Sequence, residues 1–244
     1  FLCSDFGRNI RKFILENSRI KQIIDISMIK VFRDASTYPI IIILEKTKSL
    51  KNIIKVAKPT DESELINKSL KFDNIQQATY YNFDHNLFLL ELDNKNLNII
   101  NKMKVGSKLL REYVEEITWG TSATGYGKKK IKLDKFLSLS KKEQENYVKI
   151  IQTADIQRYR IEWQKEFIPK KIYTGNKLRL FNYDKLVVGR LNKFLKAAID
   201  TEKHALGKAT LIIPKKDINI KFLLGLLNSK LIDYYFKLLF KSTH

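Results

Sequence analysis

Residues 222–236 read Phe-Leu-Leu-Gly-Leu-Leu-Asn-Ser-Lys-Leu-Ile-Asp-Tyr-Tyr-Phe, and this stretch decides how the C-terminal part of the 244-residue chain folds. Its leucines and phenylalanines recur at intervals of three and four, which places them on one face of an α-helix. Asn228-Ser229 interrupts the pattern. We therefore predict two amphipathic helices, over residues 218–227 and 230–240, which pack either on their own domain or on a partner protein.

Glycine-punctuated strands that are dense in Lys and Arg precede these helices. We expect strands at residues 117–122, 128–133, 168–173, 185–191 and 210–213. This pattern of strands, followed by two helices, predicts a mainly β domain with C-terminal helices over residues 105–244. Residues 49–104 are mixed, polar and rich in Asn turns, and we expect a connector there.

Residues 1–48 show a different order of elements. Residues 5–17 have the apolar spacing of an amphipathic helix, residues 20–26 resemble a strand, and residues 38–44 resemble a buried strand rich in isoleucine. Helix, strand, loop and strand suit the end of an α/β sheet, although 48 residues are too few to close one. The predicted fold class is therefore α+β, with a partial α/β remnant before the mainly β domain.

The formal net charge is +20, and it is unevenly distributed along the chain. Residues 1–100 hold 15 Lys and Arg against 12 Asp and Glu, whereas residues 101–244 hold 31 against 14. A biased genome composition would enrich lysine in both parts alike, so the asymmetry favours a polyanionic partner for the C-terminal part. Nucleic acid is the partner that this pattern indicates.

Composition excludes several other classes of protein. A single cysteine, Cys3, rules out an internal disulfide framework and indicates a reducing compartment, so we expect the cytoplasm. The histidines His85, His204 and His244 lack the spacing of a metal site, and we predict no catalytic residue. The longest apolar run, residues 39–44, is far below the ~20 residues that cross a bilayer. The first residues have no signal-peptide pattern, and we expect a piece of a longer protein.

The segment Gly120-Thr-Ser-Ala-Thr-Gly-Tyr-Gly-Lys-Lys-Lys130 is the first candidate for a DNA contact. It lacks the Gly-Lys-Ser/Thr ending of a nucleotide-binding loop, so nucleotide hydrolysis has no support. A turn with small hydroxyls is instead able to approach a phosphate backbone, beside lysines that neutralise charge. The alternative is a solvated basic hairpin. The residues assigned to DNA here are Gly120, Thr121, Thr124, Lys128, Lys129 and Lys130.

Two further segments carry side chains that are suited to reading DNA. Gln157 and Arg158 are able to donate paired hydrogen bonds to base edges, and strand alternation would place Arg160 on the same face as Arg158. An ion pair with Glu162 is the alternative for one of these arginines. The second segment ends a predicted strand in polar residues suited to groove contacts, or forms a plain basic turn; its candidates are Arg190, Asn192 and Lys193.

Several of these stretches resemble known proteins when they are taken in order. A resemblance to the end of the catalytic domain of adenine-N6 DNA methyltransferases covers residues 6–17, 23–26, 31–37 and 40–44. A resemblance to the TaqI-like target-recognition domain of those enzymes and of fused (type IIG) restriction-modification enzymes covers residues 120–125, 153–159, 186–190 and 222–236. It implies a Rossmann-like methyltransferase remnant over residues 1–48 and a DNA-specificity domain over residues 105–244.

Enzymes of this family transfer a methyl group from S-adenosylmethionine to an adenine that is flipped out of duplex DNA. Their Asn/Asp-Pro-Pro-aromatic motif and glycine-rich cofactor motif do not occur here. The resemblance therefore implies S-adenosylmethionine in the parent enzyme, no cofactor in this fragment, and a missing N-terminal catalytic region. Phe32 matches the aromatic residue close to the flipped base, with a buried hydrophobe as the alternative. Tyr126-Gly127 departs from the family, which carries Asn after the second glycine.

The predicted function is sequence-specific recognition of duplex DNA, as part of an adenine-specific DNA methyltransferase or a restriction-modification enzyme. The fragment alone is expected to be catalytically inactive. One alternative is an active nuclease or methyltransferase with an unrecognised site. The other is a specificity subunit that docks on a partner through its terminal helices.

Overall fold

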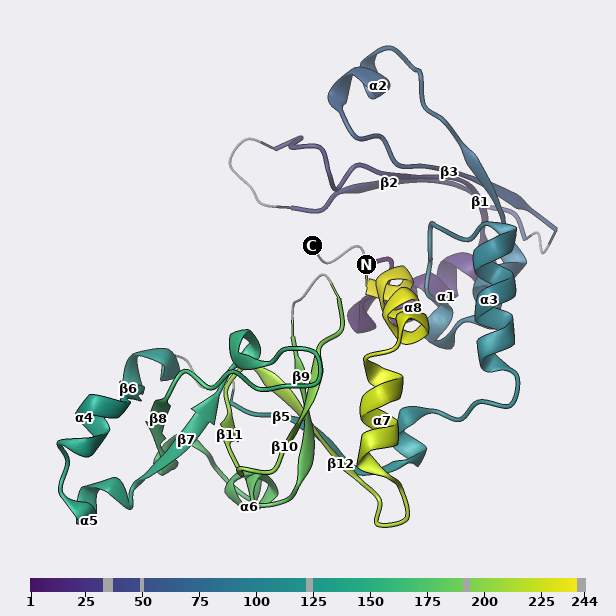
Figure 1. Cartoon of the computed structure of the whole chain (residues 1–244). Coiled ribbons are helices and arrows are strands. Elements are labelled where there is room, and N and C mark those ends of the chain that lie inside the picture. Colours follow the sequence, from purple (N-terminus) through teal and green to yellow (C-terminus); the bar gives the residue numbers. More distant parts are fainter. Residues whose placement is uncertain (33–36, 49–50, 122–124, 191–193, 241–244) are drawn as a thin grey trace. The chain divides into compact units, whose positions relative to one another are not determined.

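The computed structural model describes residues 1–32, 37–48, 51–121, 125–190 and 194–240. The chain divides into two compact units, which we name the N-terminal unit (residues 1–106, together with residues 238–240) and the C-terminal unit (residues 107–237) (Figure 1). Both mix helices with strands, so the fold is α+β. Within the described residues, no helix is long and apolar enough to cross a membrane, and no cluster of His, Cys, Asp or Glu is suited to hold a metal ion.

A four-stranded sheet forms the centre of the N-terminal unit. Its strand order is β2-β1-β3-β4, and among these strands only β1 and β3 run parallel, so the sheet by itself does not identify a Rossmann-like fold. The strands are β1 (Arg19–Asp25), β2 (Ile40–Glu45), β3 (Ile53–Ala57) and β4 (Asp73–Gln76). The α-helices are α1 (Arg8–Asn17), α2 (Glu62–Ile66) and α3 (Asn94–Lys104).

The N-terminal sheet differs from the expectation in two respects. The predicted buried strand of residues 38–44 forms β2, an edge strand whose Ile41 and Ile43 are each 42% exposed, because only one neighbouring strand packs beside it. Residues 49–104, expected to form a connector, contribute β3 and β4 to the same sheet. Ile54 and Val56 of β3 are buried, but the lysines that surround them obscured the strand in the sequence.

Helix α1 packs through a different face from the one that its apolar residues predict. Phe6, in the 3-10 turn before α1, is 83% exposed, and Ile10 and Phe13 of α1 are 52% and 63% exposed, whereas Arg11 and Ile14 are buried. The Arg11 guanidinium is held by hydrogen bonds that it donates to backbone carbonyl groups of Phe1, Ser4, His85 and Asn86. A buried charge of this kind needs such acceptors, and periodicity alone does not reveal them.

Two four-stranded sheets build the C-terminal unit (Figure 1). The first is antiparallel throughout and has the order β10-β9-β12-β5; the second has the order β11-β7-β8-β6, with β11 parallel to β7. The strands are β5 (Val114–Trp119), β6 (Ile131–Lys132), β7 (Tyr147–Ile151), β8 (Glu166–Pro169), β9 (Lys185–Gly189), β10 (Ala197–Asp200), β11 (Ala205–Leu206) and β12 (Ala209–Pro214). The α-helices are α4 (Leu133–Leu137), α5 (Lys141–Gln144), α6 (Lys177–Phe181), α7 (Ile220–Leu227) and α8 (Lys230–Phe240).

Each face of the first sheet of the C-terminal unit contributes to a core. Ile150 from the second sheet packs in one core with Val187 and Leu211 from the first. On the opposite face, Leu186 and Ile212 pack with Leu223 of α7, which lies against β10 and β9. The two predicted terminal helices are therefore present, and α7 packs on its own domain.

Two predicted strands of this unit end early. Residues 128–133 begin in a 3-10 turn, form the two-residue strand β6, and then enter α4 at Leu133. Residues 168–173 leave the sheet after Pro169, which has no N–H to continue a ladder. The strands predicted at residues 117–122, 185–191 and 210–213 overlap β5, β9 and β12, with shifted ends.

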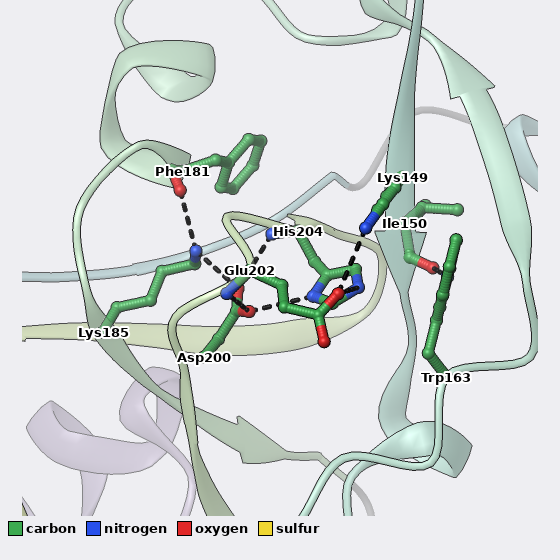
Figure 2. A network of polar contacts seen from close by, with 8 residues as sticks. All are labelled: Lys149, Ile150, Trp163, Phe181, Lys185, Asp200, Glu202 and His204. Atoms are coloured by element: carbon green, nitrogen blue, oxygen red, sulfur yellow. Dashed lines mark hydrogen bonds and ion pairs between the residues drawn. The ribbon is translucent and has the colours of Figure 1, made fainter.

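A buried polar network links β9 and β10 to the turn that leads into β11 (Figure 2). The Asp200 carboxylate lies 2.6 Å from Lys185 Nζ and 2.9 Å from His204 Nδ1, and it accepts backbone hydrogen bonds from Glu202 and His204. Lys185, Asp200 and His204 are all buried. Lys149 of β7 reaches the same turn through an ion pair of 3.1 Å with Glu202.

Asp200 is held in its charged form by this network. Burial alone would raise the pKa of Asp200, but hydrogen bonds from His204 and Lys185, together with the Lys185 charge, outweigh burial and lower it below the ordinary value. A carboxylate can only accept hydrogen bonds, so His204 Nδ1 carries the proton of that contact. Burial lowers the pKa of Lys185, because it disfavours the charged ammonium.

This arrangement predicts acid-sensitive stability. A carboxyl group with a lowered pKa stabilises the fold above its unfolded-state pKa of about 3.9, and this contribution is lost as the pH falls through the folded-state pKa. We expect the free energy of unfolding to decline more steeply below about pH 4 in the wild type than in Asp200→Asn. Urea denaturation monitored from pH 6 to pH 3, in roughly half-unit steps, measures both curves, and equal slopes would contradict the assignment.

Candidate nucleic-acid interface

Gly120 and Thr121 follow β5 directly and pack against the turn between β11 and β12. Gly120 N donates to Ala209 O at 3.1 Å, and Thr121 N donates to Gly207 O at 3.2 Å. Thr121 is buried. These two predicted DNA contacts are therefore occupied by the protein's own backbone, and Thr124 lies outside the described residues.

Substitution of Gly120 tests this packing. A Cβ atom at Gly120 would lie 2.0 Å from Leu206 O and 2.4 Å from Gly207 O, far inside van der Waals contact. Because both obstacles are backbone atoms, we expect Gly120→Ala to cost about 1–3 kcal/mol or more of stability, as overpacking does. Thermal unfolding measures the loss. Gly127→Ala is the control, because nothing lies within 4 Å of a Cβ there, and equal effects of the two changes would refute this account.

The turn after Gly125 contains one buried residue, Tyr126, and two exposed lysines, Lys128 and Lys129. Gly125 has a φ of 70°, which favours glycine, and the next residue, Tyr126, is buried with its hydroxyl 3.2 Å from Gln152 Oε1. Tyr126 thus anchors the turn to the core. Lys128 and Lys129 are exposed and available to a ligand.

Lys130 is committed to an internal ion pair. Its Nζ lies 2.5 Å from Glu166 Oε2, and the two side chains are only 17% and 13% exposed. Burial alone would raise the pKa of Glu166, but hydrogen bonds and charges from Lys130 and Lys132 outweigh it and lower the pKa. The basic run at residues 128–130 is therefore only partly a solvated face.

Residues 156–161 form a tight reversal rather than a strand. Ile156 and Ile161 bridge, and Tyr159 between them has a φ of 70°. Arg158 therefore does not share a strand face with Arg160: Arg158 Nη2 donates to the carbonyl oxygen of Asn228, whereas Arg160 Nη2 lies 2.5 Å from Glu162 Oε1. The Arg160 pair is exposed and contributes little to stability, so this arginine remains able to exchange Glu162 for a phosphate.

Gln157 is held beside this reversal. Its Oε1 accepts a hydrogen bond of 2.9 Å from Lys196 Nζ, and its Nε2 donates to Ala154 O at 3.1 Å. Lys196 Nζ also lies 5.5 Å from the centroid of the Phe194 ring, and Lys237 Nζ lies 5.8 Å from it. An exposed aromatic ring thus stands between two lysines. Asn192 and Lys193 lie outside the described residues.

Arg190, at the end of β9, meets a second exposed aromatic residue. Its guanidinium carbon lies 5.9 Å from the centroid of the Trp119 ring, and Lys177 Nζ lies at the same distance. Arg190 N donates to Thr153 Oγ1 at 3.3 Å, which fixes the start of the β9–β10 connection. We name the two aromatic clusters together the cation–aromatic surface; its members are Trp119, Lys177, Arg190, Phe194, Lys196 and Lys237.

Sequence reasoning missed most of this surface. Trp119 was part of a predicted strand, and neither its exposure nor its distance to Lys177, 58 positions away, can be read from a linear pattern. Phe194 and Lys196 follow the predicted candidates Arg190, Asn192 and Lys193 directly. An aromatic residue next to lysines is a pattern typical of nucleic-acid binding, and it could have identified Phe194 and Lys196.

Phe32 lies in the N-terminal unit, at a hollow of about 200 Å³. The ring is 53% exposed, so the alternative of a buried hydrophobe does not describe it. The hollow is lined by Ser27, Met28, Ile29, Lys30, Val31, Phe32 and Thr37. It is compatible with the predicted contact to a base, which remains a prediction.

A comparison with known protein families finds a match for the C-terminal part of the chain, which carries most of these groups. Residues 148–244 match the TaqI-like C-terminal specificity domain. No curated protein matches the chain. A TaqI-like specificity domain indicates DNA binding and sequence recognition in a restriction-modification system. The matched range includes Arg158, Arg190 and both terminal helices, whereas Trp119 and the lysines at 128–130 precede it.

Proposed function

We propose that this chain recognises a specific sequence in duplex DNA through the cation–aromatic surface of its C-terminal unit. The observation that carries the proposal is that this surface belongs largely to the region matching a TaqI-like specificity domain. Cations next to exposed rings provide charge for phosphates and flat apolar faces for bases. Arg158 and Arg160 are the residues we propose for base edges, and Lys128, Lys129 and Arg190 are proposed for phosphates.

We further propose that the parent protein is an adenine-N6 DNA methyltransferase or a restriction-modification enzyme that acts in the cytoplasm. In this proposal residues 1–48 belong to a Rossmann-like methyltransferase domain, and Phe32 faces the target base. S-adenosylmethionine would supply the methyl group in the parent. The chain has neither the Asn-Pro-Pro-aromatic nor the Phe-x-Gly-x-Gly motif, so its residues do not fit a complete cofactor site, and we expect no methyl transfer by this chain alone.

The test is selection from a pool of random duplexes by the whole chain, followed by sequencing and repeated at several salt concentrations. Enrichment of one short site supports sequence recognition, and the salt slope reports the number of phosphates contacted. Salt-sensitive binding without enrichment would reduce the function to non-specific clamping. A lack of duplex binding even at low salt would refute the proposal.

The second candidate is a protein-interaction or specificity subunit of a restriction-modification complex that has no catalytic activity of its own and docks on a partner through its terminal helices. Exposed apolar side chains on the terminal helices favour it, namely Phe222, Leu226 and Leu231. This function predicts a stable oligomer or complex that persists in high salt, because apolar association is not screened. Sedimentation of the chain in low and high salt, with and without duplex DNA, separates the two functions.

A further inference from the structure

Trp119 is exposed because α7 covers only part of its sheet. Trp119 pairs with Thr210 of β12, which in turn pairs with Val188 of β9, so the three side chains share one face. Val188 is buried in the core beside α7, which lies over β10 and β9. Val114 at the start of the edge strand β5 joins that core, whereas Ile117 and Trp119 further along β5 are exposed. The indole is consequently 53% exposed.

The cations beside Trp119 have unused capacity for an anion. Lys177 Nζ donates to Trp119 O at 3.0 Å and to Gly120 O at 2.7 Å, which positions the ammonium and leaves its third proton free. Neither Lys177 nor Arg190 forms an ion pair with Asp or Glu in the part of the chain that the structure describes. Both cations lie 5.9 Å from the ring centroid, at the outer limit of a cation–π contact, and the indole stays 53% exposed beside them.

We propose that Trp119 is a nucleobase-stacking residue, with Lys177 and Arg190 binding the adjoining phosphates. The inference deepens the proposed DNA-binding function and rests on it. An exposed indole offers a face for any base, whereas it brings only one hydrogen-bond donor, Nε1–H, and no acceptor to a groove edge. The ligand class is therefore a nucleotide unit whose base is accessible, as in a single strand or at a distorted step of a duplex.

The experiment compares the whole chain with Trp119→Ala and Trp119→Phe, using a short single-stranded oligonucleotide and the random duplex pool as probes. Removing a stacking ring typically weakens single-strand binding by about 5- to 150-fold, and we expect this for Trp119→Ala. Trp119→Phe should retain most of the affinity. The oligonucleotide should quench the wild-type tryptophan fluorescence and leave that of Trp119→Phe, which contains only Trp163, unchanged.

The salt dependence separates stacking from charge. Lys177→Ala and Arg190→Ala should each flatten the slope by about 0.7 for a single strand, whereas Trp119→Ala should leave the slope unchanged. Lys141→Ala is the matched charge control, because Figure 1 shows α5 well away from β5.

Unchanged affinity of Trp119→Ala together with absent quenching overturns the inference. If Trp119 proves not to stack but the chain still enriches one site from the duplex pool, the proposed function stands and only the stacking inference fails. If the chain binds single strands through Trp119 but does not bind duplexes, the proposed function fails and the stacking inference stands.

Discussion

Asp200→Asn is expected to lower the free energy of unfolding by about 3–5 kcal/mol, because it leaves the Lys185 charge buried without a counter-charge. The Lys185 ammonium is fully buried, and besides Asp200 it contacts the carbonyl oxygen of Phe181 at 2.8 Å (Figure 2). That carbonyl is a single neutral acceptor and cannot replace a carboxylate. Urea unfolding at neutral pH measures the change.

The double variant Lys185→Met, Asp200→Asn provides the control. Removing both charges eliminates the unpaired ion, and replacing a whole buried pair by uncharged groups is often close to neutral. We expect the double variant to be more stable than Asp200→Asn, with a coupling free energy on the order of 2 kcal/mol or more. Strictly additive single effects would show that the pair does not act as a unit.

Asn228→Ala is expected to have the second large effect on stability. Asn228 is buried at the end of α7, where its Oδ1 accepts from Ala197 N at 3.0 Å and its Nδ2 donates to Ala197 O at 2.9 Å. The side chain thus supplies the acceptor for the backbone N–H of Ala197 in β10. Alanine would leave that buried N–H unsatisfied, at about 1–3 kcal/mol, whereas Ala197 O would keep the hydrogen bond that it accepts from Tyr159 N at 2.8 Å. Thermal unfolding measures the change.

Asn219→Ala, at the other end of the same helix, is the matched control. The Asn219 side chain accepts hydrogen bonds from the backbone of Lys221 and Phe222 as an N-cap, and loss of such a cap costs about 1 kcal/mol. Asn228→Ala should therefore be the more destabilising of the two. If the costs are equal, Asn228 acts as a simple helix end and does not join α7 to β10.

Some site residues were identifiable from residue type, and others were not. Arg158, Arg160 and Arg190 were selected as side chains suited to base edges or groove contacts, and all three are exposed. Lys130 and Gly120 were predicted to contact DNA for the same reasons as their neighbours in the segment 120–130. The structure assigns them to an ion pair with Glu166 and to close contact with Leu206, which lie 36 and 86 positions further along the chain. Such pairings depend on how the strands meet, so a local pattern could not have excluded these two residues.

Local sequence determined what depends on local physics. The two terminal helices follow from apolar spacing, the basic character of residues 101–244 follows from composition, and the strands overlapping β1, β5, β9 and β12 follow from short apolar runs. Tertiary structure decided what depends on contacts between distant segments. It placed β3 and β4 in the N-terminal sheet, buried Lys185 with Asp200, and gathered Lys177 and Arg190 at Trp119. The reason is that helix periodicity and charge are properties of neighbouring residues, whereas burial and ion pairing arise only when strand order brings remote side chains together.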